Sequence, residues 1–134
     1  MIFVDTGPFL ARWLARDQYH ARAVASWNVL AGSWTPLLTT SHVLDEAITL
    51  TARRAGNRFA AERARSLLAS RALTIARPDD AVERRALDWL ERYHDQRFSF
   101  TDCLSFEVMR IAGVREAFTY DDHFRIAGIA IVEP

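Results

Sequence analysis

Residues 2–9 have the sequence IFVDTGPF, in which a short apolar run ends in an acid and a glycine-proline pair follows. Residues 2–6 are typical of a buried strand, and Gly7-Pro8 breaks the extended pattern and favours the first turn of a helix. Asp5 is therefore expected at the carboxyl end of a strand, beside a helix start. This strand-to-helix junction predicts an α/β fold.

Strands alternate with helices along the rest of the chain. The hydrophobic spacing predicts two short helices between Phe9 and Leu30, interrupted near Asp17. Further strands are expected at residues 35–40, 72–76, 116–120 and 129–134, and further helices at 41–56, 57–70, 78–94 and 99–113, with a helical turn at 124–127. The alternation predicts three layers, α/β/α, with a central, mostly parallel sheet of about five short strands in a single domain, residues 1–134.

Cap and core positions follow from the same patterns. Ser99 is expected to cap the helix that follows it, and Asp80 and Glu83 to form a capping box at the start of theirs. The positions expected to face inward on the helix after Ser99 are Leu104, Val108 and Ile111.

Composition narrows the class of protein. The chain has 17 acidic and 17 basic residues and a formal net charge of zero, so no global positive field indicates a protein that coats nucleic acid. Every basic residue is arginine, which either suits bidentate contacts with phosphate and carboxylate groups or reflects compositional drift. Cys103 has no partner for an internal disulfide, and the first residues lack the pattern of a secretion signal. We therefore expect a cytoplasmic protein without a membrane span.

Acidic residues fall at the edge of the predicted sheet where ligands bind. Asp5 follows the first strand, Asp121 follows the fourth, and Asp102 lies in the first turn of a helix beside this edge. Glu46 lies at the border of the apolar stripe of its helix, while Asp45 faces further out, so Glu46 can reach the same edge. Each acid taken singly also fits a cap or a turn. Their shared placement favours one acidic site.

Four carboxylates in one small space need compensation. Two unit charges about 4 Å apart repel by about 4 kcal/mol at an effective dielectric constant near 20. Without a cation, some of these groups would have to hold a proton. Oxygen ligands without a cysteine or histidine cluster favour magnesium or manganese over zinc. Such ions can activate water and stabilise the charge on a phosphate.

The ordered set of motifs resembles a known family. The strand that ends in Asp5-Thr6, SHVLDE at residues 41–46, FTDCLSF at 100–106 and TYDDHF at 119–124 resemble the PIN domain, and especially the bacterial VapC-type toxins. The resemblance covers nearly the whole chain, in order.

This resemblance implies an endoribonuclease that depends on Mg²⁺ or Mn²⁺, held by four acids: Asp5, Glu46, Asp102 and Asp121. Thr6 and Thr119 would support the acids, the ion or the phosphate, or would only satisfy backbone groups at strand ends. Activated water would cleave an RNA phosphodiester and leave a 3′-hydroxyl and a 5′-phosphate. A cognate VapB-like antitoxin and a homodimer are the expected partners.

Two adjacent aspartates compete for the last position of the site. Asp121 aligns with the family acid and Asp122 with its variable neighbour, although a slip of one residue would reverse the assignment. Phe124 is expected to anchor the turn by packing, and His123 to be a surface imidazole and not a ligand. The other histidines without metal-ligand spacing are His20, His42 and His94.

Other classes of function remain open at this point. A PIN-like scaffold that binds a protein or RNA without cutting it, or a metal-dependent phosphatase or DNA nuclease, would present the same acids. A phospho-accepting receiver domain would need a lysine near its site, and the chain contains none. The candidates for contacts with an RNA backbone, or for plain surface positions, are Arg53, Arg54 and Arg58.

Overall fold

The computed structural model describes the whole chain, residues 1–134, as alternating strands and helices. The strands are β1 Ile2–Val4, β2 Leu37–Thr40, β3 Leu73–Ala76, β4 Glu116–Phe118 and β5 Ala130–Val132. The helices are α1 Thr6–Trp13, α2 His20–Ser33, α3 Ser41–Ala55, α4 Asn57–Leu68, α5 Asp80–Arg92, α6 Phe100–Ala112 and α7 His123–Ile126. None of these helices has the length and apolar character that crossing a membrane requires.

The strands form one sheet in the order β3-β2-β1-β4-β5, and every neighbouring pair is parallel. Phe3 of β1 pairs with Leu38 of β2 on one side and with Ala117 of β4 on the other. The chain builds outward from β1 to β3 and then crosses to β4, so the strand order switches between β1 and β4. Open α/β sheets bind ligands at the carboxyl ends of the strands at such a switch point.

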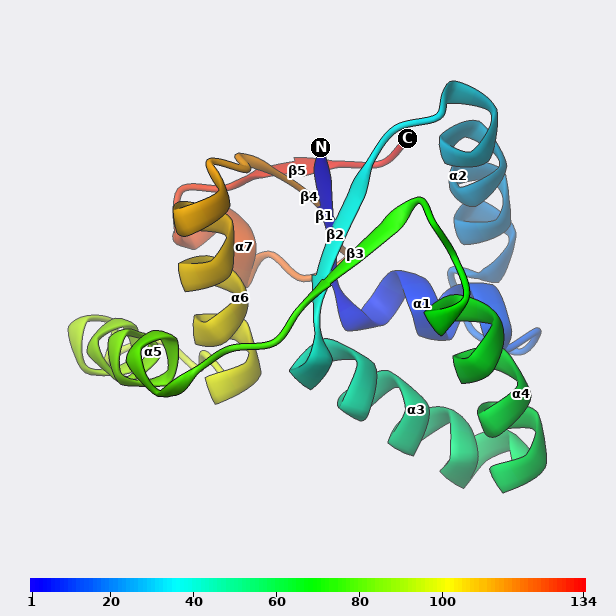
Figure 1. Ribbon diagram of the computed structural model, residues 1–134, viewed down its shortest axis with the longest axis horizontal. Helices are drawn as coiled ribbons and strands as arrows, with labels where there is room; N and C mark the ends of the chain where they lie inside the picture. The colour runs from blue at the N-terminus through cyan, green and yellow to red at the C-terminus, as the bar shows by residue number, and fades with distance from the viewer.

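Helices cover both faces of the sheet (Figure 1). The helices α1, α2 and α4 lie on one side, and α5, α6 and α7 lie on the other. The helix α3 begins where β2 ends and runs along the carboxyl edge of the sheet. The predicted three-layer α/β/α fold is confirmed, and its sheet is parallel throughout.

Aromatic side chains fill the core on each side of the sheet. Trp27 of α2 packs against Phe118 of β4 with ring centroids 5.9 Å apart. On the other side, Phe124 of α7 contacts Phe3 and Phe106, with centroid distances of 6.1 and 5.1 Å. Phe124 has 0% of its surface exposed, which confirms that it anchors the turn after β4. Large aromatic rings thus fix the loop that carries the last acids.

Two local predictions are wrong. Asp79, and not Asp80, caps α5, because its carboxylate accepts a hydrogen bond from the N–H of Val82 at 3.0 Å, while Asp80 lies inside the first turn. Ile111 was expected to face inward but is 53% exposed. Residues 110–113 are all exposed, so the last turn of α6 has no covering layer.

Candidate metal centre

An acidic hollow of about 410 Å³ opens at the carboxyl edge of the sheet, where β1 and β4 end. Residues from the junction between β1 and α1, from α3, from the start of α6 and the loop before it, and from the loop after β4 through the start of α7 line it. All the residues predicted for a site lie in its lining: Asp5, Thr6, Glu46, Asp102, Thr119 and Asp121. Segments far apart in the sequence therefore meet because the sheet is parallel and its strands end at one edge.

Asp5 is the most buried acid of the hollow, at the end of the central strand. Its Oδ2 accepts a hydrogen bond from the hydroxyl of Thr119 at 2.8 Å. Burial, and to a smaller extent the charges of Asp102 and Asp121, raise the pKa of Asp5 to about 7 against the opposing hydrogen bonds from Thr119 and the backbone of Thr6. A cation in the hollow would offset both the desolvation and the repulsion of the ionised carboxylate.

Glu46 reaches the hollow from α3. The hydroxyl of Thr40 accepts a hydrogen bond from the N–H of Val43 at 3.0 Å, which caps α3 and starts it directly after β2. Glu46 then faces the first turn of α1, where the hydroxyl of Thr6 donates to its Oε2 at 2.7 Å. Thr6 thus fixes one oxygen of Glu46 while the side chain stays accessible.

Asp102 takes part in a helix cap and in the hollow at once. Its N–H donates to the hydroxyl of Ser99, and its Oδ2 accepts from the N–H of Ser99, both at 3.0 Å. This reciprocal capping box confirms Ser99 as the cap of α6. Burial, and then the charge of Asp121, raises the pKa of Asp102. The cap and the site were alternative explanations of Asp102 in the sequence, but the cap is what holds the carboxylate in the site.

The loop after β4 separates the two adjacent aspartates. The hydroxyl of Thr119, which donates to Asp5, also accepts a hydrogen bond from the N–H of Asp121 at 3.0 Å. The side chain of Asp121 lines the hollow and is 41% exposed, whereas that of Asp122 is 84% exposed and pairs with Arg125 at 2.6 Å. Asp121 therefore faces the other acids and Asp122 faces solvent.

Sequence reasoning did not assign His123 or Arg97 to the hollow. The side chain of His123 is only 30% exposed, and its Nδ1 lies 3.4 Å from Oδ2 of Asp121 and 3.5 Å from Oδ2 of Asp102. The expected surface imidazole is therefore confirmed only in part, because the ring is partly buried and its Nδ1 faces the acids. Arg97 also lines the hollow, and its exposed side chain makes no ion pair. No motif distinguished it from the other arginines.

The donors of the hollow suit a divalent cation. Asp102, Asp121 and His123 each offer one ligand atom, and these atoms lie within 4.8 Å of one another. Carboxylate oxygens are the ligands that magnesium and manganese prefer. Because Asp5 is buried beside two further carboxylates, a cation would also relieve the repulsion that raises its pKa. The residues present therefore fit the metal that the acids imply.

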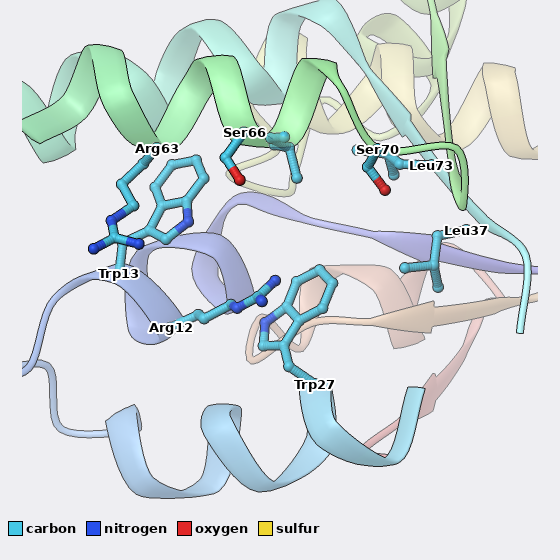
Figure 2. A pocket seen from close by; sticks show the side chains of 9 residues that line it. Arg12, Trp13, Trp27, Leu37, Arg63, Ser66, Ser70 and Leu73 are labelled. Carbon is cyan, nitrogen blue, oxygen red and sulfur yellow. The ribbon is translucent and has the colours of Figure 1, made fainter. Parts of the chain in front are cut away.

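A second hollow, of about 320 Å³, lies between α1, α2 and α4 and contains no acid (Figure 2). Figure 2 shows Arg12 extending from α1 toward the ring of Trp27, with Arg63 approaching from α4. The Arg12 guanidinium is 4.9 Å from the Trp27 ring centroid, and burial together with the charge of Arg63 lowers the pKa of Arg12. This hollow suits an anionic group, so it is separate in chemistry from the acidic one.

The chain is similar in sequence to proteins of one known family. A model of the PIN domain matches residues 2–129. The 23S rRNA-specific endonuclease VapC20 of Mycobacterium tuberculosis is 37% identical over 134 residues, covering 100% of this chain and 99% of that protein. A VapC ribonuclease of Archaeoglobus fulgidus is 32% identical over 129 residues, covering 94% of this chain and 80% of that protein.

A solved structure has the same fold. The crystal structure of Mycobacterium tuberculosis VapC20, described as a sarcin-ricin loop cleaving toxin, superposes with a TM-score of 0.90 at 34% identity. The match covers 100% of both chains. The arrangement of strands and helices around the acidic hollow is thus shared along the full length.

Proposed function

The chain belongs to the PIN domain family, and we propose that it is a divalent-metal-dependent endoribonuclease, the VapC-type toxin of a toxin-antitoxin pair. One observation carries the proposal: Asp5 is buried next to Asp102 and Asp121, with a pKa of about 7. A buried carboxylate among others is unfavourable for folding by itself, but it is what a cation site requires. A carboxyl group whose pKa is raised by burial and by neighbouring charges is typical of functional sites.

The four acids have distinct tasks in this proposal. Asp5, Asp102 and Asp121 would hold a divalent ion, and Glu46 would complete the ligand set from α3. When bound, the ion supplies the activation of a water molecule and the neutralisation of charge on the phosphate. The protein fixes its own groups beforehand, because Asp102 is held by its cap and Glu46 by Thr6. Such support keeps the acids in position before the ion and the RNA arrive.

Thr119 positions two of the acids and is not itself a proposed ligand. Its hydroxyl donates to Asp5 and accepts from the backbone of Asp121, so its single O–H donor is already used. Because the hydroxyl of Thr119 donates to Oδ2, the other carboxylate oxygen of Asp5 has no side-chain donor. That free oxygen is the one we assign to the ion.

We propose a folded loop of ribosomal RNA as the substrate, since one relative is named a 23S rRNA-specific endonuclease and the solved structure is described as a sarcin-ricin loop cleaving toxin. Arg97 is the basic side chain that lines the acidic hollow, and without a carboxylate partner it is free to contact a phosphate. Arg53 lies seven residues beyond Glu46 on α3, which corresponds to about 10 Å along the helix. Arg97 is therefore better placed than Arg53 to hold the RNA backbone at the cut.

We also propose a cognate VapB-like antitoxin as the regulator. A basic side chain of such a partner could enter the acidic hollow, form charge-assisted hydrogen bonds with the carboxylates and exclude both ion and RNA. The second hollow, with Arg12 and Arg63, would accept acidic groups of the same partner. A homodimer that acts in the cytoplasm completes the proposal.

The proposed function is tested by mapping the position at which the protein cleaves RNA. Purified protein is incubated with total RNA and with ribosomes, in Mg²⁺, in Mn²⁺ or in EDTA, and the new ends are located by primer extension. We expect a cut in the large ribosomal RNA that leaves a 5′-phosphate and a 3′-hydroxyl and that EDTA abolishes. Ends with a 2′,3′-cyclic phosphate, or cutting that continues in EDTA, would contradict the proposal.

A further inference from the structure

We propose that His123 is a nitrogen ligand of the metal centre, and that it makes the centre bind a first-row transition ion such as Mn²⁺ more tightly than Mg²⁺. The inference rests on the proposed metal-dependent function and extends it, because the four acids alone would provide only oxygen ligands. It starts from the position of one atom, the Nδ1 of His123.

The Nδ1 atom of His123 is buried and has no hydrogen-bond partner. Its neighbours are Oδ2 of Asp121 at 3.4 Å and Oδ2 of Asp102 at 3.5 Å. Both distances exceed the range of about 2.7–3.2 Å for a hydrogen bond between nitrogen and oxygen. When Nδ1 is unprotonated, its lone pair faces two carboxylates, and a cation that lies between the three groups relieves this repulsion.

A metal ion fits this spacing. Donors about 2.1 Å from an octahedral ion lie about 3.0 Å apart along an edge, and donors about 2.0–2.1 Å from a tetrahedral ion lie about 3.3–3.4 Å apart. The three donor atoms of Asp102, Asp121 and His123 lie within 4.8 Å of one another. Small side-chain adjustments would therefore place all three around one ion.

The ring of His123 is fixed in this orientation. Its backbone N–H donates to Oδ1 of Asp121 at 2.9 Å, which leaves Oδ2 of that carboxylate facing Nδ1. The ring also packs edge-to-face on Phe98, with centroids 5.3 Å apart and an interplanar angle of 69°. A ligand that is oriented before the ion arrives binds more tightly than one that must be ordered.

The imidazole nitrogen of His123 determines which ion the centre binds more tightly. Imidazole suits transition ions, whereas magnesium binds oxygen donors almost exclusively and keeps much of its water. Adding His123 to Asp102 and Asp121 therefore raises the affinity for Mn²⁺ and leaves that for Mg²⁺ nearly unchanged. Glu46 and Asp5 serve both ions equally.

The first readout is spectroscopic and uses the wild-type protein. Pulsed EPR of the Mn²⁺-loaded protein detects the nuclear coupling of a nitrogen bound to the ion. We expect this coupling in the wild type and in His94→Ala, which removes an exposed histidine in the turn after α5, and its loss in His123→Ala. Bound Mn²⁺ without nitrogen coupling in the wild type would overturn the inference while leaving the proposed function intact.

The second readout is affinity, measured by calorimetry for both ions with circular dichroism as the check on folding. We expect His123→Ala to weaken Mn²⁺ binding by about 10-fold or more and to change Mg²⁺ binding by less than about threefold. Equal weakening for both ions would show that His123 acts only on the carboxylates, which contradicts nitrogen ligation. If neither ion bound the wild type, the proposed function would fail together with this inference.

Discussion

Asp5 lies in an environment that disfavours its ionised form in the folded protein. It is buried at the end of the central strand, and its pKa rises from 3.8 to about 7. The folded state therefore binds the Asp5 proton more tightly than the unfolded state does. In the absence of metal this group favours folding at low pH, and its ionisation makes the folded state progressively less stable as the pH rises from about 4 to about 7.

Asp5→Asn should therefore stabilise the metal-free protein at high pH. The shift from 3.8 to about 7 corresponds to about 4 kcal/mol at full ionisation, as an upper bound, and to nearly zero below pH 4. Urea unfolding of both proteins in EDTA at several pH values measures the difference, which isolates Asp5 from the other acids. Asp122→Asn, at an exposed position, is the control and should change stability by less than about 0.5 kcal/mol. A difference that does not grow with pH would contradict the raised pKa.

Arg97 should affect the binding of RNA and not the binding of metal. Because it lines the hollow without an ion pair, Arg97→Ala removes a phosphate contact and should raise KM several-fold while leaving the affinity for Mn²⁺ unchanged. Steady-state cleavage and calorimetry provide the two values. Arg53→Ala, on the distant end of α3, is the matched control. An equal effect of the two substitutions would show that the hollow has no special contact at Arg97.

At the scale of elements, the cap at the start of α6 both stabilises the helix and holds the carboxylate of Asp102 in the acidic hollow. Ser99→Ala removes the hydroxyl that accepts from the N–H of Asp102, so the helix loses its cap and should lose about 1 kcal/mol in the free energy of unfolding. The carboxylate of Asp102 then loses its fixed orientation, and metal affinity should fall as well. Ser99→Thr keeps a hydroxyl and should restore both properties. If Ser99→Ala lowered the stability but left the metal affinity unchanged, the cap would not be what positions Asp102 for the ion.

The packing of α5 against α6 depends on a buried charge outside the site. Glu107 accepts hydrogen bonds from the indole of Trp89 at 3.1 Å and from Arg110 at 2.7 and 3.0 Å. These bonds, led by that from Arg110, lower the pKa of Glu107, so its contribution to stability is present above the usual pKa of 4.5 and is lost as the pH falls through the lower folded value.

Glu107→Gln removes the charge and keeps the size of the side chain. We expect a loss of about 1–3 kcal/mol at neutral pH, measured by urea unfolding, because charge-assisted bonds become neutral ones. Asp88→Asn, an exposed position on α5, should change stability by less than about 0.5 kcal/mol. If Glu107→Gln changed stability as little as Asp88→Asn, the charge of Glu107 would contribute nothing to the packing of α5 against α6.

At the scale of the whole molecule, the sequence predicted the architecture because strand and helix periodicities are local. The run from Ile2 to Val4, the hydroxyl cap at Thr40 and the capping box at Ser99 each depend on neighbours within a few positions. The cap of α5 was misplaced by one residue, since Asp79 and Asp80 are equally good caps in sequence and backbone conformation selects between them. The exposure of Ile111 was not predictable, because no other element covers the end of α6 and a local sequence pattern does not show this.

The acidic residues could be gathered at one edge from the sequence because a parallel sheet places its carboxyl ends together. The inward direction of His123 could not, since it depends on where α7 starts and on packing against Phe98. Arg97 was equally hidden, because its place in the hollow follows from the path of the chain before α6. Both depend on contacts between segments far apart in the chain.

The measurement that tests the account most directly is single-turnover cleavage of ribosomal RNA by the wild type, Asp121→Asn and Asp122→Asn, with Mn²⁺ and with EDTA. Asp121 faces the other acids, whereas Asp122 faces solvent and pairs with Arg125. We predict cleavage by the wild type and Asp122→Asn in Mn²⁺, a rate at least about 100-fold lower for Asp121→Asn, and none in EDTA. Equal rates for the two variants, or cleavage that persists in EDTA, would contradict a metal-dependent site built from these acids.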